Sequence, residues 1–252
     1  MNYLWDLLIL AVGATVGSFL NVVALRYGTG KSPLVGRSFC PACNTKLSAI
    51  DLIPVLSFIF LRGRCRSCRA KISWQYPLVE ILTAVIFLFL FKSPLALIVW
   101  CLLIVIMIYD WRHKIIPDSL VLAFGILALA MAILNNLGSD LSLALLWGPL
   151  FAAPFFLLWY FSGGKWMGLG DAKLGLGLGW LLGVASIDAF ILAFWIGATV
   201  SLLIVGWQSW QKDQKKLTIK SEVPFAPFLF AATFLVYFFK LSAFELVNNL
   251  FK

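Results

Sequence analysis

The sequence predicts an all-α, polytopic membrane protein with about eight transmembrane helices and a small zinc-bearing loop domain in the cytoplasm. Of its 252 residues, 62% are hydrophobic and only 12% are charged, and the mean hydropathy is +0.96. A soluble globular protein of this size could not bury so much apolar surface. The apolar residues also form long runs, as expected for helices that need about 20 apolar residues to cross a bilayer.

The apolar runs divide the chain into a first span (1–25), a hydrophilic loop (26–76) and a membrane core (77–252). We expect the first run to be a retained span and not a signal peptide, because Asp6 precedes it and Arg26 follows it, the reverse of a signal peptide's charge order. The sixth run, 174–187, is short and rich in glycine, so the number of spans is seven or eight. The expected spans are 4–25, 77–91, 94–109, 119–134, 141–161, 174–187, 189–207 and 224–239.

The distribution of basic residues predicts the orientation of the spans. One side of the membrane carries nine Lys and Arg in 26–76, two in 110–117, two in 162–173 and four in 208–222, which is 17 of the 20. The positive-inside rule places this side in the cytoplasm and both termini outside. Because the basic residues follow the topology, the net charge of +9 does not indicate a nucleic-acid-binding protein.

Four cysteines in the hydrophilic loop predict a metal site. Cys40-Pro-Ala-Cys43 and Cys65-Arg-Ser-Cys68 form two CxxC pairs with 21 residues between them, a pattern typical of a four-thiolate Zn²⁺ site. Thiols stay reduced in the cytoplasm, which disfavours disulfides. Four protein ligands leave the metal no open position, so the zinc would be structural. The alternatives are redox-active thiols and cysteines that bind no metal.

Two acids are expected at the cytoplasmic boundary of the membrane, Asp110 at the end of the third span and Asp171 just before the sixth. An acid at a membrane span costs free energy and is therefore a functional candidate. Gly168 and Gly170 precede Asp171 and leave room for another backbone, such as an extended peptide, to approach its carboxylate. The alternative is a flexible glycine-rich loop in which Asp171 is the N-cap of the next helix.

Two aspartates that meet can hydrolyse a peptide bond without a metal. The ionised one activates water as a general base, while the protonated one donates to the carbonyl oxygen under attack. One of the two should be protonated at working pH, because two close carboxylates do not both ionise cheaply. Ion or proton translocation by a transporter is the competing use of such acids, and a scaffold with structural acids is a third class.

An ordered set of motifs resembles the bacterial type IV prepilin peptidases, membrane aspartic proteases with the hallmark Gly-x-Gly-Asp. The resemblance covers most of the chain. The stretches that carry it are 17–23 (GSFLNVV), 37–43 (RSFCPAC), 51–57 (DLIPVLS), 61–68 (LRGRCRSC), 76–80 (YPLVE), Tyr109-Asp110 with Ile116-Pro117-Asp118, 168–174 (GLGDAKL) and 224–229 (PFAPFL).

The resemblance implies that Asp110 and Asp171 are the catalytic pair, supported by Gly168 and Gly170. The implied substrates are type IV prepilins or the pseudopilins of type II secretion, cut between a basic leader and an apolar helix at the inner face of the inner membrane. Many members also N-methylate the new terminus with S-adenosylmethionine, an activity associated with the zinc-loop region. The chain departs from a frequent family pattern at Arg112, where an additional acid is common. We expect Asp118 to be a helix N-cap, and we expect the basic loop to contact anionic membrane lipids.

Overall fold

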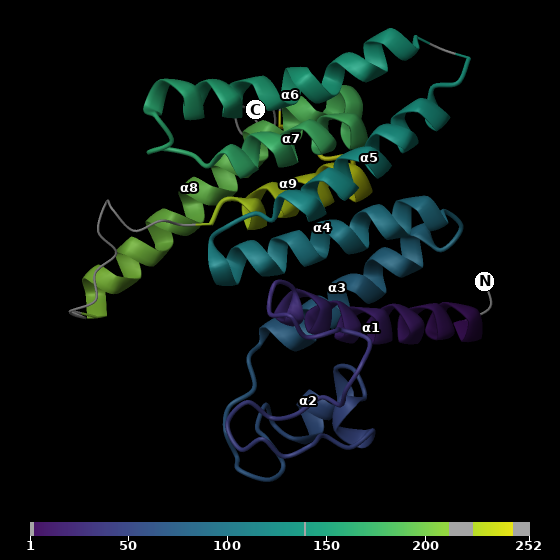
Figure 1. Cartoon of the computed structure of the whole chain (residues 1–252), viewed down its shortest axis with the longest axis vertical. Helices are drawn as coiled ribbons and strands as arrows, with labels where there is room; N and C mark the ends of the chain where they lie inside the picture. The colour runs from purple at the N-terminus through teal and green to yellow at the C-terminus, as the bar shows by residue number, and fades with distance from the viewer. Residues whose placement is uncertain (1–2, 139, 212–223, 244–252) are drawn as a thin grey trace, which may run out of the picture. The chain divides into compact units, whose positions relative to one another are not determined.

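The computed structural model describes residues 3–138, 140–211 and 224–243 (Figure 1). Within these ranges the chain is helical and has no strand, apart from two isolated backbone bridges in the loop. It divides into two compact units, Met1–Val105 and Ile106–Lys252. The boundary falls inside helix α4 (Pro94–His113).

The first unit is built on the pair of helices α1 (Tyr3–Arg26) and α3 (Gln75–Leu90), which lie side by side (Figure 1). Glycines permit their close approach. A Cβ on Gly13 would lie 2.7 Å from that of Phe87, and a Cβ on Gly17 would lie 2.9 Å from the backbone of Glu80. The loop between the two helices contains a 3-10 turn, η1 (Ile50–Leu52), and the short helix α2 (Leu56–Phe60).

The second unit is organised around α7 (Leu169–Leu182), which packs against both α5 and α6 (Figure 1). Glycines of α7 again allow the neighbouring helices to lie close to it. A Cβ on Gly177 would lie 2.5 Å from the ring of Phe124, and a Cβ on Gly179 would collide with the backbone carbonyl of Trp147. Helices α8 and α9 form a second contacting pair. The remaining bounds are α5 (Asp118–Asn135), α6 (Leu141–Ser162), η2 (Gly183–Ala185), α8 (Ser186–Gln211) and α9 (Ala226–Phe239).

The prediction of an all-α, multi-pass membrane protein is confirmed. Each expected span coincides with a helix, and among the described residues five helical runs are long and apolar enough to cross a membrane. One of these runs, Leu169–Trp207, joins α7 to α8, while α3 and α9 are shorter apolar helices. The count of eight spans therefore stays a prediction. The same holds for the boundaries at 25 and 76 and for the side of each loop. Most of the basic segment 208–222 lies outside the described residues.

Two helix starts differ from expectation. Helix α7 begins at Leu169, five residues before the expected span, so Asp171 lies in its first turn and the N-cap is Gly168 in extended conformation. Helix α5 begins at Asp118, with Pro117 as its N-cap and no side-chain cap hydrogen bond. The expected N-cap role of Asp118 is therefore wrong. Its carboxylate instead forms an ion pair with Lys173, with 2.7 Å between Oδ1 and Nζ.

Candidate functional site

The second unit brings together the two acids singled out in the sequence. Asp110 lies near the end of α4 and is buried, with 4% of its surface exposed. Asp171 lies in the first turn of α7 and is half-buried. The two carboxylates are close enough for a direct electrostatic interaction, although 61 residues separate them in the chain. The folded chain thus forms a carboxylate pair.

Each carboxylate accepts one backbone hydrogen bond. The N–H of Ala226, at the start of α9, donates to Asp110, and the N–H of Gly168 donates to Asp171. The second bond is one half of a capping box, in which the acid at the third helical position reaches back to the N-cap residue. Asp110 Oδ2 is buried and has no hydrogen-bond partner among the described residues. That oxygen is free to hold a proton or to accept one from a reactant.

Four helix ends meet around this pair. Gly170 packs on Ile116 in the connection before α5, where a Cβ on the glycine would lie 2.9 Å from that of Ile116. The ion pair between Asp118 and Lys173 joins the starts of α5 and α7. With the bond from Ala226, the end of α4 and the starts of α5, α7 and α9 therefore lie on one side of the helices.

Three members of this site were not assigned from sequence. Ala226 acts through its backbone, Ile116 through contact with a glycine, and Lys173 through an ion pair with a residue 55 positions away. All three lie in or beside the motifs that carried the resemblance, but a motif does not name a tertiary partner. The alternative to a catalytic role for Asp171 was that it is the N-cap of the next helix. Asp171 does cap its own helix, but it does so from the third helical position, and the N-cap is Gly168.

The four cysteines of the first unit also meet. Their sulfur atoms all lie within 4.8 Å of one another, and the sulfurs of Cys40 and Cys68 are 3.9 Å apart. Tetrahedral zinc with Zn–S bonds of about 2.3 Å needs sulfurs about 3.8 Å apart. Cys40 and Cys65 are buried, whereas Cys43 is half-buried and Cys68 exposed. The cluster fits a structural metal such as Zn²⁺.

The two CxxC turns have the same backbone geometry, repeated at an offset of 25 residues. In each turn the first cysteine's N–H donates to a carbonyl five residues later, and its carbonyl accepts from the residue four positions later. An antiparallel bridge closes each turn, between Phe39 and Lys46 and between Arg64 and Lys71. This repetition presents two thiols from each side, which is the arrangement that a tetrahedral ion requires.

The thiols of Cys43 and Cys68 differ in pKa. Hydrogen bonds with Thr45, the side chain first and then the backbone, lower the pKa of Cys43 to about 6. The backbone N–H of Ala70 acts in the same direction on Cys68, but hydrogen bonds with the other thiols and desolvation raise the pKa of Cys68 to about 11. Four adjacent thiolates would repel one another, so a cation is needed to hold all four deprotonated.

The loop is joined to the α1–α3 pair through Glu80. Its Oε2 accepts the N–H of Val55 at 2.7 Å, and its carboxylate also accepts a hydrogen bond from Ser18. Val55 has φ 60° and ψ −50°, and the N–H of Leu56 donates to the carbonyl of Pro54 at 2.5 Å. This is a γ-turn with positive φ at a β-branched residue, a strained conformation. The buried Glu80 carboxylate holds the strained turn in place.

Comparisons with known proteins place this site in a family. A model described as the type IV leader peptidase family matches residues 95–239, and one described as the bacterial peptidase A24 N-terminal domain matches residues 11–93. The chain belongs to the type IV leader peptidase family. The first match contains both aspartates, and the second contains all four cysteines and Glu80. The resemblance stated from the sequence motifs is confirmed.

Several curated relatives have the name "Prepilin leader peptidase/N-methyltransferase". The chain is 34% identical to one from Dichelobacter nodosus, over 82% of this chain and 72% of the relative. It is 31% identical to one from Bacillus subtilis (strain 168), over 90% of this chain and 91% of the relative. It is 32% identical to one from Stutzerimonas stutzeri, over 87% of this chain and 86% of the relative. No solved structure matches the chain.

Proposed function

We propose that this protein is a prepilin leader peptidase of the bacterial inner membrane, in which Asp110 and Asp171 are the catalytic pair. The observation that carries the proposal is the meeting of these two carboxylates at the ends of α4 and α7, inside the part of the chain that matches the leader peptidase family. The substrates are prepilins or pseudopilins, as the relatives' names and the motif resemblance indicate.

In the proposed mechanism, one aspartate is ionised and the other protonated. The ionised carboxylate takes a proton from water as the water oxygen attacks the carbonyl carbon of the scissile peptide bond. The protonated carboxyl donates to the carbonyl oxygen, which gives a neutral geminal diol. The diol then loses a hydroxyl proton to one carboxylate, the C–N bond breaks, and the amine leaves with a proton from the other. Asp110 Oδ2, buried and without a partner among the described residues, is suited to hold the shared proton.

The location of the pair suits a substrate that enters from the membrane boundary. We place the four gathered helix ends at the cytoplasmic face and both termini outside, from the charge distribution. A basic leader would then lie in the cytoplasm and the substrate's apolar helix in the bilayer. Gly168 leaves space beside Asp171, since a Cβ on this glycine would lie 3.7 Å from Asp171 Oδ2. An unwound substrate segment can approach the carboxylate there.

N-methylation of the new terminus is the second proposed activity, and the relatives' names support it. S-adenosylmethionine would supply the methyl group. The residues that bind it are not assigned. Zn²⁺ held by Cys40, Cys43, Cys65 and Cys68 would fix the loop without taking part in either reaction. We assign the basic residues to membrane orientation and lipid contact and not to nucleic acid.

The test is prepilin cleavage by the purified full chain in liposomes, comparing wild type with Asp110→Asn and Asp171→Asn. We expect each variant to stay folded and to lose at least about 10²–10⁴-fold in cleavage rate, the usual contribution of a general acid or base. Asp118→Asn is the matched control, because it removes an exposed carboxylate from the same group of helix ends and should cost less than about tenfold.

Two outcomes would contradict the proposal. Normal cleavage by either aspartate variant would remove that residue from the chemistry. A wild type that cuts no pilin-like substrate but carries an acid-dependent ion flux in the same liposomes would favour a transporter.

A further inference from the structure

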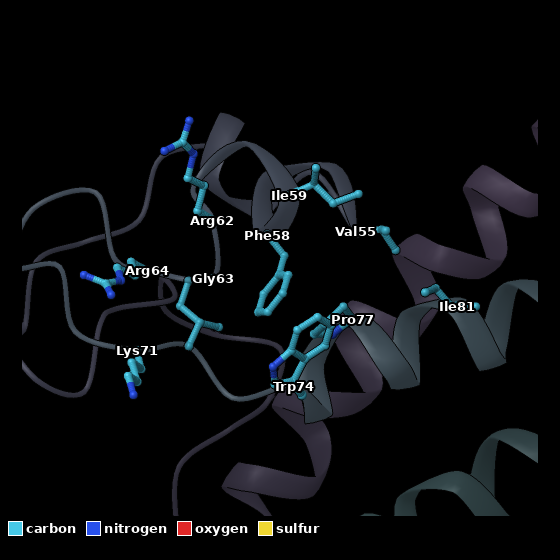
Figure 2. Close-up of a pocket in the computed structure, with 11 residues that line it drawn as sticks. Val55, Phe58, Ile59, Arg62, Gly63, Arg64, Lys71, Trp74, Pro77 and Ile81 are labelled. Carbon is cyan, nitrogen blue, oxygen red and sulfur yellow. The ribbon is translucent and has the colours of Figure 1, made fainter.

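A cavity of about 710 Å³ lies in the first unit where the loop meets the start of α3. It lies wholly within Met1–Val105, so it belongs to the loop unit and does not depend on the aspartate pair. Its lining has two chemically distinct ends (Figure 2). The side chains of Arg62, Arg64 and Lys71 lie at one end, and the apolar Val55, Pro77 and Ile81 lie at the other.

The three cations at the basic end are uncompensated. Among the described residues none of their side chains forms an ion pair or a hydrogen bond, and no acid lines the cavity. Arg26 and Arg66 differ in this respect, because Arg26 donates to loop carbonyls and Arg66 pairs with Asp51. Other loop cations, such as Lys31 and Lys46, also have no side-chain partner in the described part of the chain, but they do not line the cavity. Glu80, which lies next to Ile81 in the sequence, uses Oε2 to accept the Val55 N–H. The basic end therefore has the composition of an anion site.

The backbone forces two of these cations together. Arg64 and Lys71 are the two residues of the antiparallel bridge that closes the second CxxC turn. Like charges directly opposite each other across such a bridge are destabilising. The equivalent bridge of the first turn joins Phe39 to Lys46 and brings no second cation. A bound anion between Arg64 and Lys71 would remove a repulsion that the fold of the turn creates.

The other end of the cavity is apolar and adjoins a helix of the membrane region. Phe58 and Trp74 form its middle wall, with ring centroids 4.8 Å apart (Figure 2). Trp74 directly precedes α3 and is exposed, as is Ile81 about two turns further along. A tryptophan at the start of an apolar helix is typical of the membrane interface. The cavity therefore runs from the basic loop to a lipid-exposed face of α3.

We propose that this cavity binds an anionic phospholipid, with its phosphate at the basic end and the start of an acyl chain against the α3 side. A ligand with a phosphate and an apolar tail matches both ends at once. A free phosphate would leave the apolar end unused. S-adenosylmethionine carries a sulfonium and an ammonium group, and three uncompensated cations without an acid disfavour it. The loop thereby becomes a lipid-anchored element as well as a metal site.

The test measures lipid binding, not cleavage, so it can fail without affecting the proposed peptidase. The purified full chain is titrated in detergent with phosphatidylglycerol and with phosphatidylcholine of the same acyl chains, and bound lipid is read by native mass spectrometry. The cavity variant is Arg62→Gln/Arg64→Gln/Lys71→Gln. The matched control is Lys31→Gln/Arg37→Gln/Lys46→Gln, three exposed loop cations outside the cavity. Zinc content is measured on each sample to verify the loop.

We expect wild type to bind phosphatidylglycerol over phosphatidylcholine, the cavity variant to lose at least tenfold in phosphatidylglycerol binding, and the control to change less than threefold. Inorganic phosphate at equal concentration should not compete. Equal losses of phosphatidylglycerol binding in both triple variants would show that only the net charge of the loop matters, and would contradict a lipid site in the cavity. Full competition by phosphate would make it a free-anion site. Loss of S-adenosylmethionine binding in the cavity variant with lipid binding unchanged would assign the cavity to the methyl donor.

Discussion

The cysteine loop and the aspartate pair are stabilised in opposite ways. Between Tyr27 and Trp74 the only buried residues are Cys40 and Cys65, so the interior of the loop consists of two of its four candidate metal ligands. The aspartates lie on helix ends held by closely packed helices, whose contacts depend on glycines such as Gly179. We therefore expect the stability of the cysteine loop to depend on a bound metal ion. The stability of the aspartate site should depend on glycines, which have no side chain at the helix contacts.

Removal of the metal should have the largest effect and should affect the loop alone. Structural zinc sites supply about 10–16 kcal/mol of apparent binding free energy in small domains, and the loop has no apolar core to replace it. We expect chelation, or Cys65→Ser, to make the segment between Tyr27 and Trp74 rapidly cleavable by trypsin, while the helix content of the second unit persists. Cys101→Ser, outside the cluster, is the control. If the loop resists trypsin after the metal is lost, its stability does not depend on the metal, and the contrast with the aspartate site does not hold.

A methyl group on Gly179 should damage only the second region. A Cβ at this position would collide with the Trp147 carbonyl and lie 2.8 Å from the Gly148 Cα, and neither backbone atom can turn aside. Overpacking of this kind costs about 1–3 kcal/mol. We expect Gly179→Ala to lower the thermal unfolding midpoint in detergent and the rate of prepilin cleavage, with zinc content unchanged.

The matched control for that substitution is Gly125→Ala. No atom lies within 4 Å of a Cβ at Gly125, which is also inside a helix of the second unit. Alanine there should leave stability unchanged or raise it by roughly 0.5–1 kcal/mol, because glycine is costly in a helix interior. Similar losses at both positions would mean that helix packing does not control the aspartate site.

Substitution of Glu80 tests the connection between the loop and its helix pair. Loss of the acceptor for the Val55 N–H should cost about 1–3 kcal/mol and release the strained γ-turn. We expect Glu80→Ala to speed tryptic cleavage of the loop, whereas Glu80→Gln, which keeps an acceptor oxygen, should do so much less. Equal effects of the two substitutions would show that the charge and not the hydrogen bond holds the turn.

The smallest effect is expected at the ion pair between Asp118 and Lys173. Both side chains are exposed, by 76% and 43%, and exposed pairs contribute about 0–1 kcal/mol. A double-mutant cycle with Asp118→Asn and Lys173→Gln, read by thermal unfolding, should give a coupling free energy below about 1 kcal/mol. A larger coupling would show that the aspartate site depends on surface charge as well as on packing.

The sequence predicted features that depend on composition and spacing. Apolar runs located the helices, CxxC spacing predicted that the four cysteines cluster, and charge distribution together with motifs selected Asp110 and Asp171. Features that depend on tertiary contacts were not predictable. Gly170, in the early first turn of α7, packs on Ile116, and Asp118 pairs with a lysine 55 positions away. The bond from Ala226 to Asp110 uses a backbone group, which no side-chain pattern reveals.

The matching turns around the metal have a consequence for how the loop can vary. Each CxxC turn is closed by its own backbone hydrogen bonds, so the segment between them is not needed to form either half of the site. A bound ion would fix both ends of that segment, and the entropic cost of closing a loop rises only slowly with its length. Residues between the turns can therefore be added, removed or exchanged while the metal geometry stays the same. The loop can therefore change in this segment without refolding around the four cysteines.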